Sequence, residues 1–133
     1  MQKKIIILVD DNPTTLFYNN DILSEIYPDK ELFSYETSSL FLNDYLEGKF
    51  ENCEDILVLL DINMPEYSGF DVLSEIEDEV ENLDNLRVIL VTSSRLKSDS
   101  ERSSRFNSII GYIEKPLTET KLFDCFVVNQ GTN

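Results

Sequence analysis

The chain has 133 residues, of which 41% are hydrophobic, and its formal net charge is −15. This length favours one domain with a substantial core, and the strong negative charge makes direct binding to nucleic acid or to an anionic membrane surface unfavourable. The chain contains no histidine, which largely excludes zinc sites and histidine-based general-base catalysis.

The first half of the chain begins with a β-branched run, Ile5–Val9, that is predicted to be a strand covered on both faces. Asn12 and Pro13 then supply an N-cap and a first-turn proline for a helix that ends before Pro28. Glu31–Tyr35 is a weaker strand, which we expect at an edge of the sheet.

The middle of the chain contains the most apolar segment, Ile56–Leu60, which is therefore predicted to be the central strand. Before it, Ser38 or Ser39 can cap a second helix that Gly48 ends. After it, Ser68 leads into a third helix. The residues of this helix that we expect to face inward are Phe70, Leu73, Ile76 and Val80.

The last third of the chain contains two further predicted strands, Arg87–Val91 and Ile109–Ile113. Between them, Ser98–Phe106 is helix-like by position but poor in apolar residues, so we expect it to be loosely held. A last helix runs from about Thr118, with Leu122, Phe123 and Phe126 expected on one side. Five alternations of strand and helix predict a parallel sheet with helices on both faces.

Charge is unevenly distributed in the second half of the chain. Six carboxylates and no cation lie between Glu75 and Asp84, and we interpret this run as a solvated helix face. Four cations lie between Arg95 and Arg105, the one locally positive segment of the chain. A docking surface for a partner is a less favoured interpretation of this basic stretch.

Targeting signals are not evident in the sequence. Cys53 and Cys125 have no CxxC spacing, which favours reduced thiols in a cytosolic protein. No apolar stretch approaches the length of a membrane span, and the short apolar run near the N-terminus ends in two aspartates, unlike a signal sequence. We therefore expect a cytoplasmic protein.

Polar residues follow four of the predicted strands at the point where each strand ends. Asp10 and Asp11 follow the first strand, Asp61 the third, Thr92 the fourth and Lys115 the fifth. In open parallel sheets these ends face the crevice where ligands bind. A charged carboxylate just past a buried strand lowers the stability of the fold unless another group pairs with it, because burial disfavours the charged form. We therefore expect an acidic pocket with a single lysine.

These residues resemble the receiver domains of two-component response regulators, of the stand-alone chemotaxis-regulator type. The resemblance also includes Asn63-Met64-Pro65, Gly69, and Tyr112 three residues before Lys115-Pro116. The resemblance covers nearly the whole chain. It implies an α/β fold with a doubly wound, five-stranded parallel sheet in the flavodoxin-like order 2-1-3-4-5 and five helices. It also implies a single receiver domain over residues 1–133 with no output domain.

The resemblance implies a phosphoryl-acceptor site with Mg²⁺ as cofactor. Asp11, Asp61 and the backbone carbonyl of Asn63 would bind the metal directly, and Asp10 would act mostly through a metal-bound water. Such an oxygen-only ligand set suits Mg²⁺.

Catalytic roles are implied for Asp61, Lys115 and Thr92. Asp61 would accept a phosphoryl group, which would then meet the Lys115 ammonium, the Thr92 hydroxyl and a backbone N–H near Ser93. The Lys115-Pro116 peptide bond is expected to be cis.

Switching is implied for Thr92 and Tyr112. Thr92 would draw its loop inward, and Tyr112 would occupy the space left behind. Asn63 and Ser94 are expected to tune the lifetime of the phosphorylated state. The donor would be a sensor histidine kinase, a histidine phosphotransfer protein or a small acyl phosphate. A downstream protein would dock on the fourth helix, fifth strand and fifth helix, and the chain would catalyse only its own phosphorylation and dephosphorylation.

Three other classes of protein share parts of this pattern. A flavodoxin-like flavin carrier needs a phosphate-binding loop after the first strand, where Asp10 and Asp11 would repel a phosphate. A phosphatase of the haloacid dehalogenase type needs a general acid where Asn63 stands, and places its nucleophile on the first strand. The main alternative is a degenerate receiver that acts as a phosphorylation-independent interaction module, against which the complete acid set argues.

Overall fold

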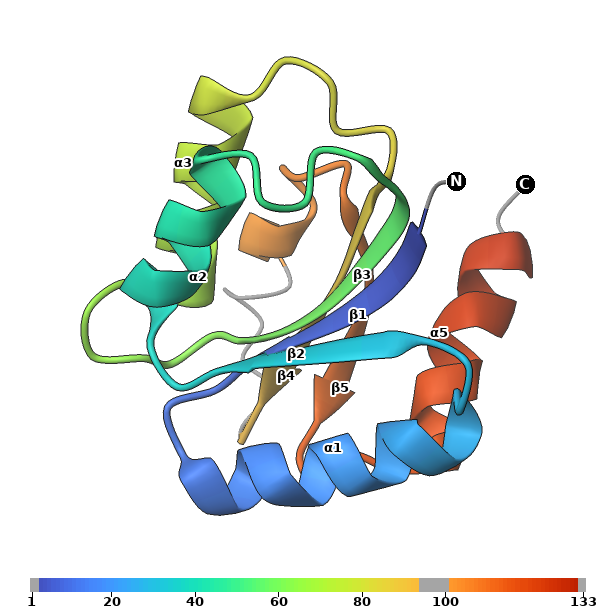
Figure 1. Ribbon diagram of the computed structural model, residues 1–133. Helices are drawn as coiled ribbons and strands as arrows, with labels where there is room; N and C mark the ends of the chain where they lie inside the picture. The colour runs from blue at the N-terminus through green and yellow to red at the C-terminus, as the bar shows by residue number, and fades with distance from the viewer. Residues whose placement is uncertain (1–2, 94–100, 132–133) are drawn as a thin grey trace.

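The computed structural model describes residues 3–93 and 101–131 of the chain (Figure 1). The elements follow one another as β1 (Lys3–Val9), α1 (Pro13–Ile26), β2 (Glu31–Tyr35), α2 (Ser38–Leu46), β3 (Cys53–Asp61), α3 (Gly69–Glu79), β4 (Leu86–Thr92), β5 (Ile109–Glu114) and α5 (Glu119–Gly131). All strand pairs are parallel, and the strand order is β2-β1-β3-β4-β5. The predicted fold, with β3 central and β2 at an edge, is confirmed.

The segment expected to form the fourth helix is described only in part. Residues 98–100 lie outside the described residues, and residues 101–103 are helical. Phe106, just beyond them, stacks on the Phe70 ring of α3 with the two ring centroids 6.2 Å apart, a separation typical of aromatic pairs. The end of this segment is therefore anchored to the core through an aromatic contact.

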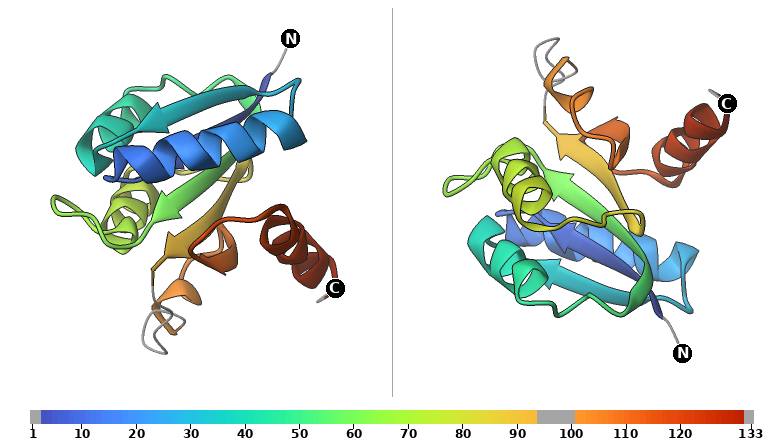
Figure 2. Two further views of the ribbon diagram at one scale, coloured as in Figure 1. Left: turned by 90° about the horizontal axis from the view of Figure 1, so that it is seen from below. Right: turned by 90° about the horizontal axis from the view of Figure 1, so that it is seen from above.

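Helices cover both faces of the sheet, as the two views in Figure 2 show. One core cluster joins the sheet to α2 and α3, and the other joins it to α1 and α5. Alternate residues of β1 belong to different clusters, so Ile5 and Ile7 face one helical layer while Ile6 and Leu8 face the other. This explains why the buried strands are continuous apolar runs instead of alternating ones.

Helix starts follow capping rules, with one correction to the prediction. Asn12 caps α1, its side chain accepting hydrogen bonds from Thr14 and Thr15. The prediction that Ser38 or Ser39 caps α2 was wrong, because Thr37 is the N-cap and accepts from the Leu40 N–H at 3.2 Å. Both serines lie in the first turn, where their hydroxyls bond to a neighbouring loop instead.

The ends and inward faces of the other helices agree with the prediction except at one residue. Gly48 follows α2 with a φ of +89°, a conformation that favours glycine. In α5, Leu122 and Cys125 are buried and Phe126 is half-buried, whereas Phe123 is 42% exposed. The prediction that Phe123 shares one side with Leu122 was wrong, because adjacent positions of a helix point about 100° apart, and Cys125 completes the buried side instead.

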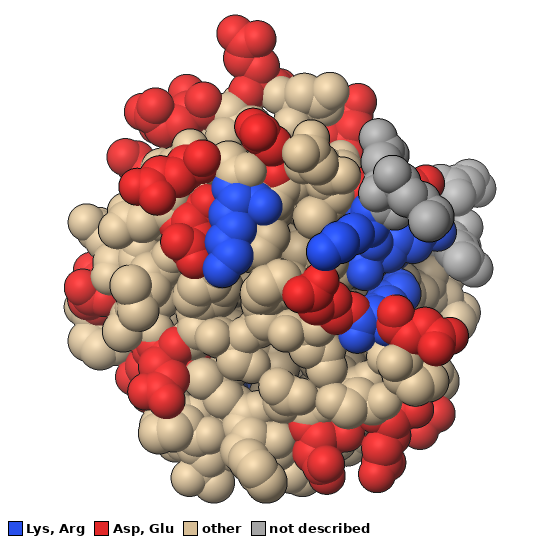
Figure 3. All heavy atoms as spheres, viewed as in Figure 1, with Lys and Arg blue, Asp and Glu red and all other residues tan. Residues whose placement is uncertain are grey.

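The surface of the protein carries mainly acidic side chains, as the net charge of −15 predicts. On the face seen in Figure 3, acidic side chains are spread widely, whereas Lys and Arg gather in a few places. All six carboxylates between Glu75 and Asp84 are exposed, as predicted, but α3 ends at Glu79, so Glu81 and Asp84 lie beyond the helix. Among the described residues, no helix is both long enough and apolar enough to cross a bilayer. The expectation that residues 1–133 carry no output domain stays a prediction.

Candidate functional site

The strand register brings the predicted polar residues to one edge of the sheet. Val9 pairs with Leu60, so Asp10 emerges beside Asp61. Asp61 in turn pairs with Val91, and Thr92 with Glu114, which places Lys115 at the same edge.

Three carboxylates converge at this edge. Asp10, Asp11 and Asp61 each offer an oxygen, and these oxygens lie within 4.8 Å of one another. Asp10 and Asp61 are buried, each with 4% of its surface exposed, whereas Asp11 is exposed at the mouth of the cluster. An oxygen-only set with one ligand open to solvent fits Mg²⁺, which binds through few carboxylates and keeps several waters.

Backbone donors orient two of these carboxylates. The Asn63 N–H donates to Asp61 Oδ1 at 3.2 Å, and the Asn12 N–H donates to Asp10 Oδ1 at 2.9 Å. Asn63 itself is exposed next to Asp61. The second contact was not predicted, and it ties the acid cluster to the residue that caps α1.

Lys115 lies between the two buried carboxylates. Its Nζ is 2.9 Å from Asp10 Oδ2 and 3.5 Å from Asp61 Oδ2. The Lys115 backbone N–H donates to the Thr92 carbonyl at 2.6 Å. The Lys115-Pro116 peptide bond is cis, as the resemblance implies. The Lys115 ammonium therefore contacts both buried carboxylates, Asp10 and Asp61, and offsets part of the energetic cost of removing their charges from water.

The charges in the pocket shift two pKa values. Burial, followed by the negative charge of Asp10, raises the pKa of Asp61 to about 6, although Lys115 and the Asn63 N–H oppose this shift. Burial alone would lower the pKa of Lys115, but the hydrogen bond to Asp10 and the charge of Asp61 raise the pKa above its ordinary value. Lys115 is therefore an ammonium at neutral pH, and Asp61 is a carboxyl that titrates unusually close to neutrality.

Close packing behind Asp61 depends on a glycine. A Cβ atom on Gly69 would lie 2.8 Å from the Asp61 carbonyl oxygen and 3.2 Å from the Ile62 Cα. The Gly69 N–H donates to the Ile62 carbonyl at 2.9 Å. A side chain here would have to push α3 away from the end of β3, so Gly69 sets the position of the loop beside the acid cluster.

The loop between β3 and α3 is held from its other side by α2. Ser38, with 1% of its surface exposed, accepts a hydrogen bond from the Tyr67 N–H at 3.2 Å, and Ser39 donates to Glu66 at 2.8 Å. The prediction treated both serines only as caps. Their part in positioning this loop has no local signal, because the bonded residues are 27 to 29 positions apart.

Thr92 and Tyr112 lie on one face of the sheet. Thr92 is fully buried at the end of β4, and Tyr112, half-buried on β5, pairs with Leu90. Leu90 and Tyr112 both belong to the core layer under α2 and α3. Thr92 lies two residues after Leu90 in β4, so its side chain faces the same side of the sheet. Ser94 and the first part of the basic stretch from Arg95 lie outside the described residues.

Comparison with known proteins identifies the family. The model of the response regulator receiver domain matches residues 6–126, and the chain belongs to this family. It is 31% identical over 125 residues to the polar-differentiation response regulator DivK of Brucella ovis, covering 91% of each chain. The chain is thus a receiver domain of a two-component system with an acidic pocket.

Solved structures agree with this fold. A two-component response regulator from Cytophaga hutchinsonii superposes with a TM-score of 0.83 over 98% of this chain and 99% of the other, at 20% identity. The response regulator TrrA from Thermotoga maritima superposes with a TM-score of 0.71 over 95% and 98% of the two chains, at 25% identity. That protein was crystallised with Mg²⁺ and a beryllium fluoride.

Proposed function

We propose that Asp61 accepts a phosphoryl group from a sensor histidine kinase or a histidine phosphotransfer protein, in the presence of Mg²⁺. The observation that carries the proposal is the position of Lys115, whose ammonium lies 2.9 Å from Asp10 and 3.5 Å from Asp61. An ammonium held at this distance can move onto an oxygen of a phosphoryl group attached to Asp61, and so hold the product.

Mg²⁺ would be held by Asp11, Asp61 and the backbone carbonyl of Asn63, with Asp10 acting through a metal-bound water. When bound, the ion neutralises negative charge on the carboxylates and on the phosphoryl oxygens. The convergence of three carboxylate oxygens within 4.8 Å supports this assignment.

Transfer requires Asp61 as an ionised nucleophile. A carboxylate oxygen of Asp61 forms a bond to phosphorus while the bond from phosphorus to the donor's histidine nitrogen breaks, and the nitrogen keeps the electron pair. The hydrogen bond from Asn63 holds one Asp61 oxygen in place while the other reacts. Thr92 would donate its hydroxyl to the phosphoryl group.

The response to phosphorylation would be a movement of Thr92 and Tyr112. Thr92 moves toward the phosphoryl group, and the Tyr112 ring follows into the space behind it. The two residues lie on the same sheet face, in adjacent strands, which supports this coupling. The altered surface would be the fourth helix with β5 and α5, where a downstream protein docks. Asn63 and Ser94 would set how long the phosphoryl group persists.

The chain would catalyse only its own phosphorylation and dephosphorylation. We infer a cytoplasmic location for this exchange, because the spacing of Cys53 and Cys125 favours reduced thiols, which suit a reducing compartment.

A spectroscopic titration tests the proposal. Amide spectra of the ¹⁵N-labelled protein are recorded with Mg²⁺ before and after addition of beryllofluoride, a phosphoryl mimic. We expect changes at the ends of β3, β4 and β5 in the parent and none in Asp61→Asn. Glu54→Gln removes a charge from an exposed residue of β3 and should respond like the parent. A parent that does not respond would favour a phosphorylation-independent interaction module.

A further inference from the structure

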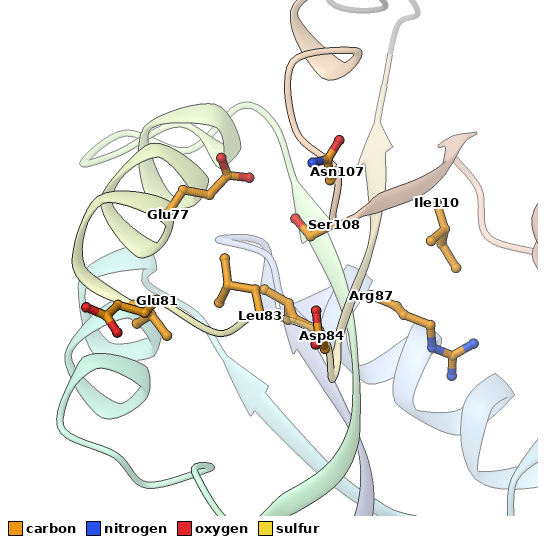
Figure 4. Close-up of a pocket in the computed structure, with 10 residues that line it drawn as sticks. Glu77, Glu81, Leu83, Asp84, Arg87, Asn107, Ser108 and Ile110 are labelled. Atoms are coloured by element: carbon orange, nitrogen blue, oxygen red, sulfur yellow. The ribbon is translucent and has the colours of Figure 1, made fainter.

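A pocket of about 550 Å³ lies at the end of the sheet opposite Asp61 (Figure 4). It is bounded by Glu77 of α3, the segment that joins α3 to β4, the first residues of β4, and the residues around the start of β5. Glu77 stands on the α3 side, and Asn107 and Ser108 stand on the β5 side. Pockets of this volume are typical of small-molecule sites. Phosphoryl transfer at Asp61 does not involve this pocket.

Ser108 gives the pocket an unsatisfied hydrogen-bonding group. The residue is 7% exposed, and its Oγ is buried with no hydrogen-bond partner among the described residues. Its backbone carbonyl accepts the Val88 N–H at 2.8 Å, which fixes the residue at the start of β5. Buried hydroxyls without partners are uncommon and cost about 1–3 kcal/mol. Ser108 therefore points to a ligand that supplies the missing hydrogen bond.

The charge around the pocket selects a cation. Glu77, Glu81 and Asp84 are among its lining residues. Arg87 also lines it, but its guanidinium is bound to both oxygens of Asp55 at 2.7 and 3.0 Å. In addition, α3 ends here with no basic residue in its last turn, so the negative end of the helix dipole has no nearby cation from that turn.

The arrangement of these acids favours an organic cation over a metal ion. Among the described residues, the carboxylates close enough to share a metal are those of Asp10, Asp11 and Asp61. In Figure 4, Glu77 is directed toward Asn107 and Ser108, whereas the Glu81 carboxylate points away from them. The remaining lining is partly apolar and can cover an alkyl chain, through Val80, Leu83, Leu86 and Ile110.

We propose that this pocket binds an alkyl guanidinium or alkylammonium group. The cation lies between the Glu77 carboxylate and the Ser108 hydroxyl, and donates a hydrogen bond to each. The alkyl chain packs on Leu83 and Leu86. This assignment also gives part of the acidic run from Glu75 to Asp84 a role beyond solvation.

An amide-shift titration with a matched pair of probes tests the proposal. Butylguanidinium carries the cation, and butylurea has nearly the same shape without charge. We expect butylguanidinium to shift amides in residues 80–87 and 107–110, and butylurea to leave them unchanged. Equal shifts with both probes, or no localised shifts with butylguanidinium, would overturn the proposal.

Three variants separate this site from general attraction to an acidic protein. Glu77→Gln should weaken butylguanidinium binding about tenfold, because it removes a charged hydrogen-bond acceptor. Ser108→Ala should weaken it about fivefold and leave the fold intact, since the hydroxyl has no partner to lose. Glu75→Gln removes the same charge from an exposed α3 residue that does not line the pocket, and should change affinity by less than about twofold. Similar losses in Glu75→Gln and Glu77→Gln would refute the site.

The source of the cationic group is tested by a blocked Gly-Arg-Gly peptide. Shifts like those from butylguanidinium would identify an arginine side chain as an acceptable source, and their absence would restrict the site to small molecules. Asp61→Asn should bind butylguanidinium like the parent, so failure of phosphoryl transfer and failure of this site are distinguishable.

Discussion

Asp61→Asn should stabilise the metal-free protein at neutral pH. Burial and the neighbouring Asp10 raise the pKa of Asp61 from 3.8 to about 6 in the folded state, even with Lys115 beside it. In the unfolded chain Asp61 has its ordinary pKa. At neutral pH the folded protein therefore holds Asp61 in its charged form, although the pocket favours the protonated form. The difference between the two pKa values corresponds to roughly 3 kcal/mol of lost stability.

The sign and pH dependence of this effect follow from the higher folded-state pKa. The loss of stability is complete above about pH 7, decreases as the pH falls through 6, and disappears below the ordinary pKa near 3.8. Asparagine is neutral throughout, and Lys115 keeps its contact with Asp10 at 2.9 Å. The stability gain of Asp61→Asn should therefore be about 3 kcal/mol near pH 7.5 and about 1 kcal/mol near pH 4.5.

Urea unfolding followed by circular dichroism in EDTA measures this gain at both pH values. Because the chain carries a net charge of −15, removal of any carboxylate relieves some general repulsion. Glu25→Gln, at an exposed position of α1, measures that general contribution. A gain in Asp61→Asn no larger than in Glu25→Gln, or a gain that does not shrink on acidification, would refute the assigned electrostatics.

Three further predictions concern the metal site, the packing of α5 and the edge of the sheet. Asp11→Asn should weaken Mg²⁺ binding at least about tenfold in calorimetry, because it removes a metal ligand; unchanged affinity would exclude Asp11 as a ligand. Gly111→Ala should cost about 1–3 kcal/mol in urea unfolding, because the new Cβ would lie 2.6 Å from Cys125 Sγ and 2.7 Å from its Cβ. A further Cys125→Ala should restore only part of this loss. Tyr35→Phe should cost about 1 kcal/mol through loss of the 2.7 Å hydrogen bond to Asp44, and an unchanged unfolding midpoint would contradict that value.

The convergence of the acid cluster was predictable from sequence because strand ends are encoded locally. Asp10 and Asp61 each follow a continuous apolar run, and a parallel sheet places such ends at one edge. The α-helix positions were predictable for the same reason, since Asn12 and Gly48 act within one turn of the residues that they cap. Phe123 was misplaced because it directly follows Leu122, and adjacent positions of a helix point in different directions.

Contacts between distant segments could not be predicted from a single sequence. The bond from Tyr67 to the buried Ser38 joins the β3–α3 loop to α2, and neither residue has a local pattern that indicates it. The same holds for the α3–β5 pocket, which Glu77 and Ser108 both line only because the fold brings α3 beside the start of β5. In both places the sequence shows which residue types are present, but it does not show which of them lie close together in the fold.

Mass spectrometry after incubation with acetyl phosphate and Mg²⁺ would show whether Asp61 accepts a phosphoryl group. The parent should gain the mass of one phosphoryl group, located by peptide mapping to Asp61, and Asp61→Asn should gain none. A parent that stays unmodified, or a phosphoryl group mapped to another residue, would contradict the account.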